Sequence, residues 1–348
     1  METATSHPAI DDEPDGRPPQ TWQGIPGVAE TADGSLWITW YTGGPKEPDA
    51  RNVVVLERSD DGGATWTRVC MIGADGSTRA FDPSLWVDPT GRLWHIWNQS
   101  DEGVHELFDG RGGVWARHAE VEAGQAPEWS PARRLSNGVS MNKPIVTDAG
   151  DWLLPASVWA QGPLGRTDEP RDANVYASSD GGVTWSHRGG ASVHPSDRTF
   201  DEHMVVQLPS GHLWMLIRTL SGLAESFSTD GGASWTLARP SGFGPHTSSR
   251  VFFATLRNGD IVLIRNSDRS RRDGLSIWRS RDAGASWSLA AVIDERPDLT
   301  YPDATQLADG RLAVVYDRDR LSRGEIVLRF VDVEGSMSVT EPIVVSVV

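Results

Sequence analysis

An eight-residue motif repeats along this chain, and it constrains the fold more than any other feature of the sequence. The motif reads Ser-x-Asp-x-Gly-x-Thr/Ser-Trp, and its four copies are residues 59–66, 178–185, 228–235 and 280–287. The last three copies are about 50 residues apart, and the first interval is about twice as long. Trp129 stands near the middle of that interval, in a degenerate copy at 126–135. The chain is therefore built from units of about 50 residues.

A second repeat gives the number of units. Short turns that contain glycine, each followed by an apolar stretch, recur at Gly34, Gly91, Gly150, Gly211, Gly259 and Gly310. No sustained helical period lies between these turns, whereas strand-like patterns do. Four short strands in about 50 residues are typical of a β-propeller blade. We therefore predict an all-β fold, a six-bladed β-propeller that residues 21–348 form as one domain.

The first 20 residues differ from the rest of the chain. Residues 1–20 are polar and acidic, contain four prolines and lack the apolar segment of a secretory signal. We expect a disordered lead-in there, and we expect a segment after Thr21 to contribute to the last blade. No apolar run is long enough to span a bilayer. A cytoplasmic protein is expected, and a secreted form with a trimmed signal is the alternative.

The charge balance argues against several classes of function. The chain has 48 acidic and 32 basic residues, which gives a formal net charge of −16. Such a surface argues against partners that are nucleic acids or anionic membranes. The single cysteine, Cys70, cannot form an internal disulfide, and no Cys/His spacing offers a zinc site. We expect no metal or organic cofactor, and the sequence does not specify an oligomeric state.

The aspartates of the repeated motif are interpreted as structural. Asp and Ser side chains bond to nearby backbone N–H groups, glycine supplies positive φ, and the tryptophan packs between sheets. The motif lacks the other oxygen ligands of a calcium loop. We expect the motif tryptophans to be mostly buried near the periphery, away from the axis. Four equivalent acids cannot all serve one catalytic site, so the candidate site excludes Asp61, Asp180, Asp230 and Asp282.

These motifs, within six predicted blades, resemble the Asp-box repeats of the sialidase (neuraminidase) superfamily over residues 22–330. The resemblance implies a site on the propeller axis, where three arginines hold a substrate carboxylate. It also implies an Asp acid/base and a Tyr nucleophile that a Glu activates. A neutral phenol suits an anionic substrate, because a carboxylate nucleophile would be repelled. Asp-boxes also occur in binding modules, so residues outside the boxes must decide the function.

Two segments match the motifs that carry the family's nucleophile. Residues 200–219 resemble the Glu-then-Arg blade, which implies that Glu202 activates the nucleophile and that Arg218 binds the carboxylate. Residues 300–317 resemble the nucleophile segment, which implies that Tyr301 is the nucleophile. The structural alternatives are a salt-bridged pair at a strand end for the first segment and a tyrosine packed at a blade edge for the second. We expect the Tyr301 hydroxyl and the Glu202 carboxylate to lie within hydrogen-bonding reach.

Other matched positions are less specific. Arg272 resembles the family's third arginine, with Arg269 and Arg271 as adjacent alternatives. Asp317 falls where the family carries a Glu that orients an arginine, and it is one methylene shorter. His203, next to the activating Glu, is interpreted as a partner of a sugar hydroxyl, as a catalytic base or as a packed histidine.

The N-terminal motif departs from the family pattern. Residues 23–26 read Gln-Gly-Ile-Pro, so Gly24 stands where the family has its first arginine. Asp49 matches the place of the acid/base, and the alternative is a turn acid. A charge-assisted bond of the kind lost at Gly24 contributes about 1.5–3 kcal/mol.

A replacement cation would be needed to hold an anionic sugar. The cations at comparable blade positions are Arg79, Lys143 and Arg250. We expect the cavity to be locally positive despite the net charge, because a cleft can focus a potential of the opposite sign.

Two classes of function follow from the sequence. The first is an exo-acting glycosidase that removes a terminal sugar by attack of Tyr301, with Glu202 as its activator and Asp49 as acid/base. Its sugar would be a sialic acid, a related ulosonic acid, a uronic acid or a neutral deoxy sugar such as rhamnose. A lyase that uses Tyr301 or His203 as the base on a uronate is a variant of this class. The second class is a non-catalytic glycan-binding propeller, which the loss of the arginine at Gly24 favours.

Overall fold

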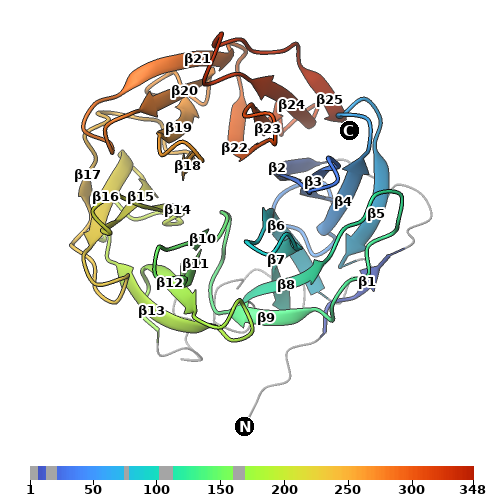
Figure 1. Ribbon diagram of the computed structural model, residues 1–348, viewed down its shortest axis with the longest axis horizontal. Helices are drawn as coiled ribbons and strands as arrows, with labels where there is room; N and C mark the ends of the chain where they lie inside the picture. Colours follow the sequence, from blue (N-terminus) through green and yellow to red (C-terminus); the bar gives the residue numbers. More distant parts are fainter. Residues whose placement is uncertain (1–6, 13–21, 74–77, 102–112, 160–168) are drawn as a thin grey trace.

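The strands of the chain form a ring of antiparallel sheets. The computed structural model describes residues 7–12, 22–73, 78–101, 113–159 and 169–348. Within these ranges there are six sheets around a central axis and no helix (Figure 1). Accordingly, no helix capable of crossing a membrane is found in the described part of the chain. The prediction of an all-β, six-bladed propeller is confirmed.

Each blade is one sheet, and apart from the outer strand β1 its strands follow the chain from the axis to the rim (Figure 1). The first blade contains β2 (Gln23–Glu30), β3 (Leu36–Thr42), β4 (Val53–Ser59), β5 (Thr67–Ile72) and the outer strand β1 (Ile10–Asp11). The second contains β6 (Thr78–Val87), β7 (Leu93–Asp101), β8 (Gly113–Ala119) and β9 (Arg133–Ser136). The third contains β10 (Ile145–Val146), β11 (Trp152–Pro155), β12 (Ala173–Ser178) and β13 (Ser186–Ala191).

The remaining three blades are built in the same way. The fourth contains β14 (His203–Gln207), β15 (Leu213–Thr219), β16 (Gly222–Ser228) and β17 (Arg239–Pro240). The fifth contains β18 (Phe252–Thr255), β19 (Ile261–Asn266), β20 (Leu275–Ser280) and β21 (Ser288–Asp294). The sixth contains β22 (Leu299–Gln306), β23 (Leu312–Arg318), β24 (Glu325–Val331) and β25 (Ile343–Ser346).

The N-terminal part of the chain differs from the prediction in two ways. The segment after Thr21 enters β2, which pairs with β3 in the first blade and does not join the last one. The reason is that β25 already supplies the outer strand of the sixth blade. Strand β1 pairs with β5, so part of the expected lead-in is a strand. Residues 1–6 and 13–20 of that lead-in lie outside the described residues.

The first and sixth blades close the ring through side chains rather than through a shared sheet. The backbone N–H of Ile25 donates to Asp317 Oδ2 at 2.8 Å. The N–H of Val28 donates to Asp303 Oδ2, also at 2.8 Å. Two buried carboxylates of the sixth blade therefore hold β2, the innermost strand of the first.

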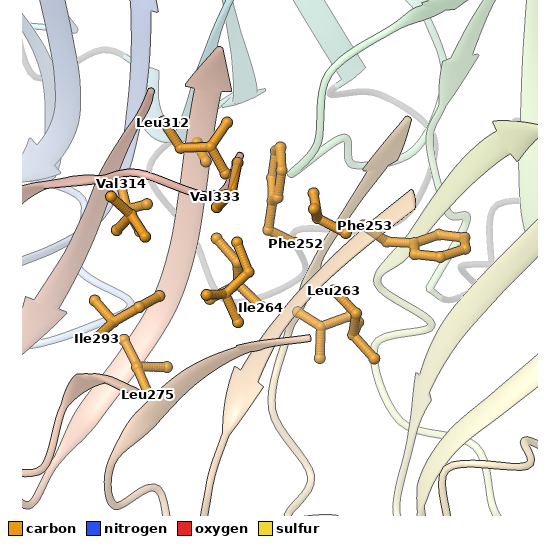
Figure 2. Packing of buried hydrophobic residues seen from close by; sticks show 14 of the residues in the cluster. Phe252, Phe253, Leu263, Ile264, Leu275, Ile293, Leu312, Val314 and Val333 are labelled. Carbon is orange, nitrogen blue, oxygen red and sulfur yellow. The ribbon is translucent and has the colours of Figure 1, made fainter. Parts of the chain in front are cut away.

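The hydrophobic core lies between the faces of neighbouring blades. Figure 2 shows the boundary between the fifth and sixth blades, where Phe252, Ile264 and Leu275 pack against Leu312 and Val314. All five side chains are buried. Burial of such side chains contributes about 1.5–3 kcal/mol each. This packing between the blades holds the inner strands in place around the axis.

The repeated motifs form the same hydrogen-bonded turn in each copy, which confirms their structural interpretation. In the first copy, Ser59 Oγ donates to Asp61 Oδ1 and accepts from Gly63 N, both at 2.8 Å. Asp61 also accepts from the N–H and the hydroxyl of Thr65. The indole N–H of Trp66 donates to Gly63 O at 3.1 Å. The motif tryptophans are half-buried, which is less than expected, and none of them lines the axial cavity.

The motif aspartates predict a loss of stability in acid. Hydrogen bonds from Ser234 and Ser228 lower the pKa of Asp230 from its ordinary 3.8 to about 2, and the other three copies are shifted alike. A lowered pKa stabilises the folded state fully above about pH 4, and this contribution is lost as the pH falls toward 2. We expect the melting temperature of Asp230→Asn to fall less between pH 4 and pH 2 than that of the wild type. Equal falls in the two proteins would contradict this role.

Candidate active site

A cavity lies where the six blades meet. Its volume is about 330 Å³, and every blade contributes to its lining. The lining residues are Glu47, Pro48, Arg79, Phe81, Asp82, Met141, Trp159, Phe200, Glu202, Arg218, Arg272, Tyr301 and Arg320. Two larger hollows, of about 520 and 590 Å³, are each lined by one blade alone. The axial cavity is the better candidate for a site, because charged groups from five of the six blades converge on it.

A bulge in β22 turns Tyr301 toward the cavity. The register of β22 with β23 shifts between Thr300 and Asp303, and Tyr301 has φ of 51° before Pro302. A non-glycine residue with positive φ is uncommon and marks a backbone that its surroundings hold in place. Tyr301 is buried, and burial together with the negative charge of Glu202 raises its pKa.

Arg218 joins the two groups expected to perform the chemistry. Its Nη1 donates to Glu202 Oε1 at 2.8 Å and to the Tyr301 hydroxyl at 3.3 Å. Burial opposes the charge of Arg218, but the adjacent Glu202 carboxylate raises its pKa overall. The other oxygen, Glu202 Oε2, is buried without a hydrogen-bond partner in the described structure. Tyr301 and Glu202 thus share the cavity, and Arg218 contacts both of them.

The loop that carries Asp49 places Glu47, and not Asp49, in the lining of the cavity. Asp49 accepts two hydrogen bonds from the Arg51 guanidinium, at 2.8 and 3.0 Å, and does not line the cavity. The Arg51 bond lowers the pKa of Asp49 to about 2. Glu47, two residues earlier, lines the cavity and accepts a hydrogen bond from the Tyr41 hydroxyl.

Of the three arginines considered at positions 269, 271 and 272, Arg272 lines the cavity and the other two do not. The Arg272 guanidinium lies 5.6 Å from the Tyr301 ring centre. Its Nη2 donates to Ser248 O at 2.9 Å. The alternatives Arg269 and Arg271 are exposed.

The three cations considered as replacements for an arginine at Gly24 have different surroundings. Lys143 Nζ is held by Val28 O, Leu85 O and Asp303 Oδ2 at 2.6–2.8 Å, so its three donors are used. It lies outside the cavity lining.

Arg250 and Arg79 lie closer to the site. Arg250 donates to Tyr301 O at 2.9 Å and Pro302 O at 3.1 Å, and therefore supports the bulge from behind. Of the three candidates, Arg79 alone lines the cavity, where it packs on Phe81 at 4.1 Å and donates to Asn52 Oδ1.

His203 and Asp317 are buried beside the cavity and do not line it. His203 Nε2 lies 2.8 Å from Asn174 O, and its Nδ1 lies 3.1 Å from Ser157 Oγ. Burial lowers the pKa of His203 to about 4, so the imidazole is neutral at pH 7. Asp317 accepts from Ile25 N and from the Thr300 hydroxyl, and burial raises its pKa. Both side chains have packed, structural surroundings.

Asp82 is a cavity residue that the sequence reasoning missed. It has φ of 44° before Pro83, in a bulge of β6 that matches the bulge at Tyr301. Its Oδ1 is buried without a hydrogen-bond partner in the described ranges. Burial and the charge of Glu47 raise the pKa of Asp82 to about 8. The signal in the sequence was a residue before proline at the same place in three blades: Ile25, Asp82 and Tyr301.

Arg320 is the second missed residue. It follows β23, lines the cavity and stacks over the Tyr301 ring with its guanidinium 4.8 Å from the ring centre. Its Nη1 lies 3.1 Å from Glu47 Oε2. Four arginines and three carboxyl groups line the cavity, as a locally positive site requires. In the described residues, no group of three or more His, Cys, Asp or Glu side chains could hold a metal ion.

A family model, the BNR repeat-like domain, matches residues 34–314, which is most of the chain. The chain belongs to this family. It is a BNR-repeat propeller of the sialidase superfamily, so the resemblance seen in the sequence is confirmed. The BNR-repeat protein is 27% identical to a sialidase of Micromonospora viridifaciens over 84% of its own length and 49% of that protein's. It thus spans about half of this curated relative.

Solved structures share the fold of this BNR-repeat protein. A Hadza microbial sialidase has a TM-score of 0.68 at 17% identity, over 85% of this chain and 63% of that one. A protein of unknown function from Dyadobacter fermentans has a TM-score of 0.66 at 17% identity, over 93% and 97% of the two chains. At such identities the likeness establishes the propeller.

Proposed function

We propose that the protein is an exo-acting glycosidase that removes a terminal acidic sugar, sialic-acid-like in character, from a glycan. The observation that supports this most strongly is the cluster of Tyr301, Arg218 and Glu202 in the axial cavity. The cavity volume of about 330 Å³ is at the lower end of small-molecule sites and suits a single sugar. Its arginines suit a sugar that carries a carboxylate.

The proposed reaction uses the tyrosine as nucleophile. Tyr301 Oη forms a bond to the anomeric carbon while its proton passes to Glu202, which has a free oxygen. The bond from the anomeric carbon to the leaving oxygen breaks, and that oxygen takes a proton from a general acid. Water then hydrolyses the bond between tyrosine and sugar, the acid group takes the proton of that water, and Glu202 returns its proton to Tyr301.

Two carboxyl groups are candidates for the general acid, and the geometry favours Asp82. A general acid must hold a proton at working pH, and the raised pKa of Asp82, about 8, meets this condition. Asp49 is the candidate from the sequence. To act, it would have to leave Arg51 and enter the cavity.

We expect the activity of the wild type to fall above about pH 8, and we expect Asp82→Asn to lack this alkaline fall. The acid is protonated below that pH and loses its proton above it. For a sugar leaving group, kcat should fall by about 10²–10⁴-fold, whereas an aryl leaving group with a low pKa needs less help. The measurement is a pH–rate profile with both substrates, and Asp49→Asn is the matched control. If Asp49→Asn lost the alkaline limb and Asp82→Asn kept it, Asp49 would be the acid.

A binding propeller is the second candidate function. Arg218 Nη1 donates to both Glu202 and the Tyr301 hydroxyl. Among the described contacts there is no direct hydrogen bond between Glu202 and that hydroxyl, and its absence favours binding without catalysis. A lyase with His203 as its base is not supported, because His203 contacts Asn174 and Ser157 outside the cavity lining.

The test is a product screen of the purified protein on sialosides, uronides and rhamnosides. We expect release of a free acidic sugar with its anomeric configuration retained, measured by nuclear magnetic resonance. An unsaturated product, seen by its ultraviolet absorbance, would show a lyase. Binding of acidic sugars without any product would show the glycan-binding propeller.

A further inference from the structure

The space beside Gly24 is already filled by another residue. A Cβ at this position would overlap Arg320 Cδ, and it would lie 3.1 Å from Arg320 Cγ and 2.8 Å from Asp317 Oδ2. Gly24 is not in the left-handed region, so its backbone tolerates a side chain. A side chain at position 24 is therefore opposed mainly by Arg320, and Asp317 Oδ2 would have to shift slightly to admit it. Both residues come from the opposite end of the described chain.

Arg320 reaches the cavity from the sixth blade with spare hydrogen-bonding capacity. Its guanidinium stacks 4.8 Å from the Tyr301 ring centre and 5.6 Å from the Trp22 ring centre. Its Nη1 is an ion-pair neighbour of Glu47 Oε2 at 3.1 Å, but it makes no hydrogen bond with the described residues. Glu47 compensates the charge of Nη1, and the guanidinium keeps N–H groups that can donate to a ligand in the cavity.

Three arginines around Tyr301 line the cavity, and they come from three different blades. Arg218 contacts the hydroxyl at 3.3 Å, and the guanidinium groups of Arg272 and Arg320 lie 5.6 and 4.8 Å from the ring centre. A planar anion bound next to the tyrosine would be within reach of more than one guanidinium fork, which is the geometry that carboxylates prefer.

We propose that Arg320 supplies the anion-binding guanidinium that position 24 lacks, and that Gly24 is small because Arg320 occupies its space. This inference rests on the proposed function, since it assigns the carboxylate of the acidic sugar to Arg320. Arg320 is thus a specificity-determining residue that discriminates the acid from its neutral analogue. Lys143 and Arg250 do not fill this role, because neither of them lines the cavity.

Moving the arginine from position 320 to position 24 tests the proposal. The probes are N-acetylneuraminic acid, glucuronic acid and their methyl esters, and the readout is the Kd from calorimetric titration. We expect Arg320→Ala to weaken binding of an acid by about 10- to 100-fold and to leave binding of its ester nearly unchanged. Gly24→Arg alone should weaken binding or lower stability, because it overlaps Arg320. The double variant Gly24→Arg/Arg320→Ala should regain part of the lost affinity, because the new arginine enters the vacated space.

The control is Arg323→Ala, which removes the same charge from an exposed side chain on the same loop. Melting temperatures identify any variant that fails to fold. Equal weakening of acid and ester in Arg320→Ala, or a folded double variant with no recovery, would overturn the proposal. So would the absence of binding of either acid to the wild type. Because the readout is binding, a wild type that binds acids but releases no sugar would refute the proposed hydrolysis and leave the role of Arg320 supported.

Discussion

Replacing Tyr301 by phenylalanine is expected to lower kcat by about 10⁴-fold or more, because it removes the nucleophilic oxygen. The folded state should change little, since the ring keeps its packing and loses one hydrogen bond from Arg218, worth about 0.5–1.5 kcal/mol. Binding of an acidic sugar should persist, because the arginines around the ring remain. The measurements are single-turnover kinetics, calorimetric binding and thermal melting.

Tyr316→Phe is the matched control for this experiment. Tyr316 is also buried, and its hydroxyl donates to Asp294 Oδ2 at 2.6 Å, away from the axial cavity. Its loss should lower stability and leave kcat unchanged. A Tyr301→Phe protein with near-normal turnover would refute the tyrosine mechanism. The reaction would then have to use another cavity group, with Glu47 and Asp82 as the first to examine.

Replacing Glu202 by glutamine should impair both chemistry and stability. The proton of Tyr301 loses its acceptor, which should lower kcat by about 10²–10⁴-fold. Arg218 is buried and paired with Glu202 at 2.8 Å, so the variant leaves an unpaired buried charge. Breaking such a pair destabilises a protein by about 3–5 kcal/mol. Chemical denaturation and steady-state kinetics measure the two effects separately.

Glu57→Gln is the control that separates stability from chemistry. Glu57 is buried and pairs with Arg68 at 2.7 Å in the first blade, outside the cavity lining. It should lose stability to a similar degree and keep its turnover per folded molecule. If Glu202→Gln behaved as Glu57→Gln does, Glu202 would be a structural partner of Arg218 alone.

The fold could be predicted from the sequence because its repeat is regular. The glycine turns from Gly34 to Gly310 fixed the number of blades, and the motif turns marked where outer strands begin. The assignment of the first strand to the last blade was wrong, because the repeat does not show at which boundary the ring closes. That information lies in side chains such as Asp303 and Asp317, which bond the backbone of β2 across the boundary.

The candidate site could be predicted only in part. Glu202, Arg218, Arg272 and Tyr301 stand in recognisable motifs, and the structure gathers all four around one cavity. Asp49 was selected by its position on a loop. The loop carries a second carboxylate, Glu47, and the sequence does not show which of the two faces the cavity.

Arg320 could not have been selected from the sequence. It stands among several arginines after β23, and no spacing distinguishes it from Arg318 or Arg323. Its relation to Gly24 is purely spatial, because the two residues meet only when the first and sixth blades are side by side. Asp82 could have been found, since its Asp-Pro pair repeats the pattern of Tyr301-Pro302.

Each boundary between blades has a consequence for how the ring responds to a ligand. In the described residues no sheet spans two blades, so the ring can open at a boundary without breaking a strand ladder. The axial cavity draws on every blade, and a bound sugar would therefore touch both sides of several boundaries. A ligand that binds only the closed ring raises the free energy of opening. At a ligand concentration of 100 times its Kd, this increase is about 2.7 kcal/mol. Slower amide exchange along the inner strands would then report occupancy of the cavity.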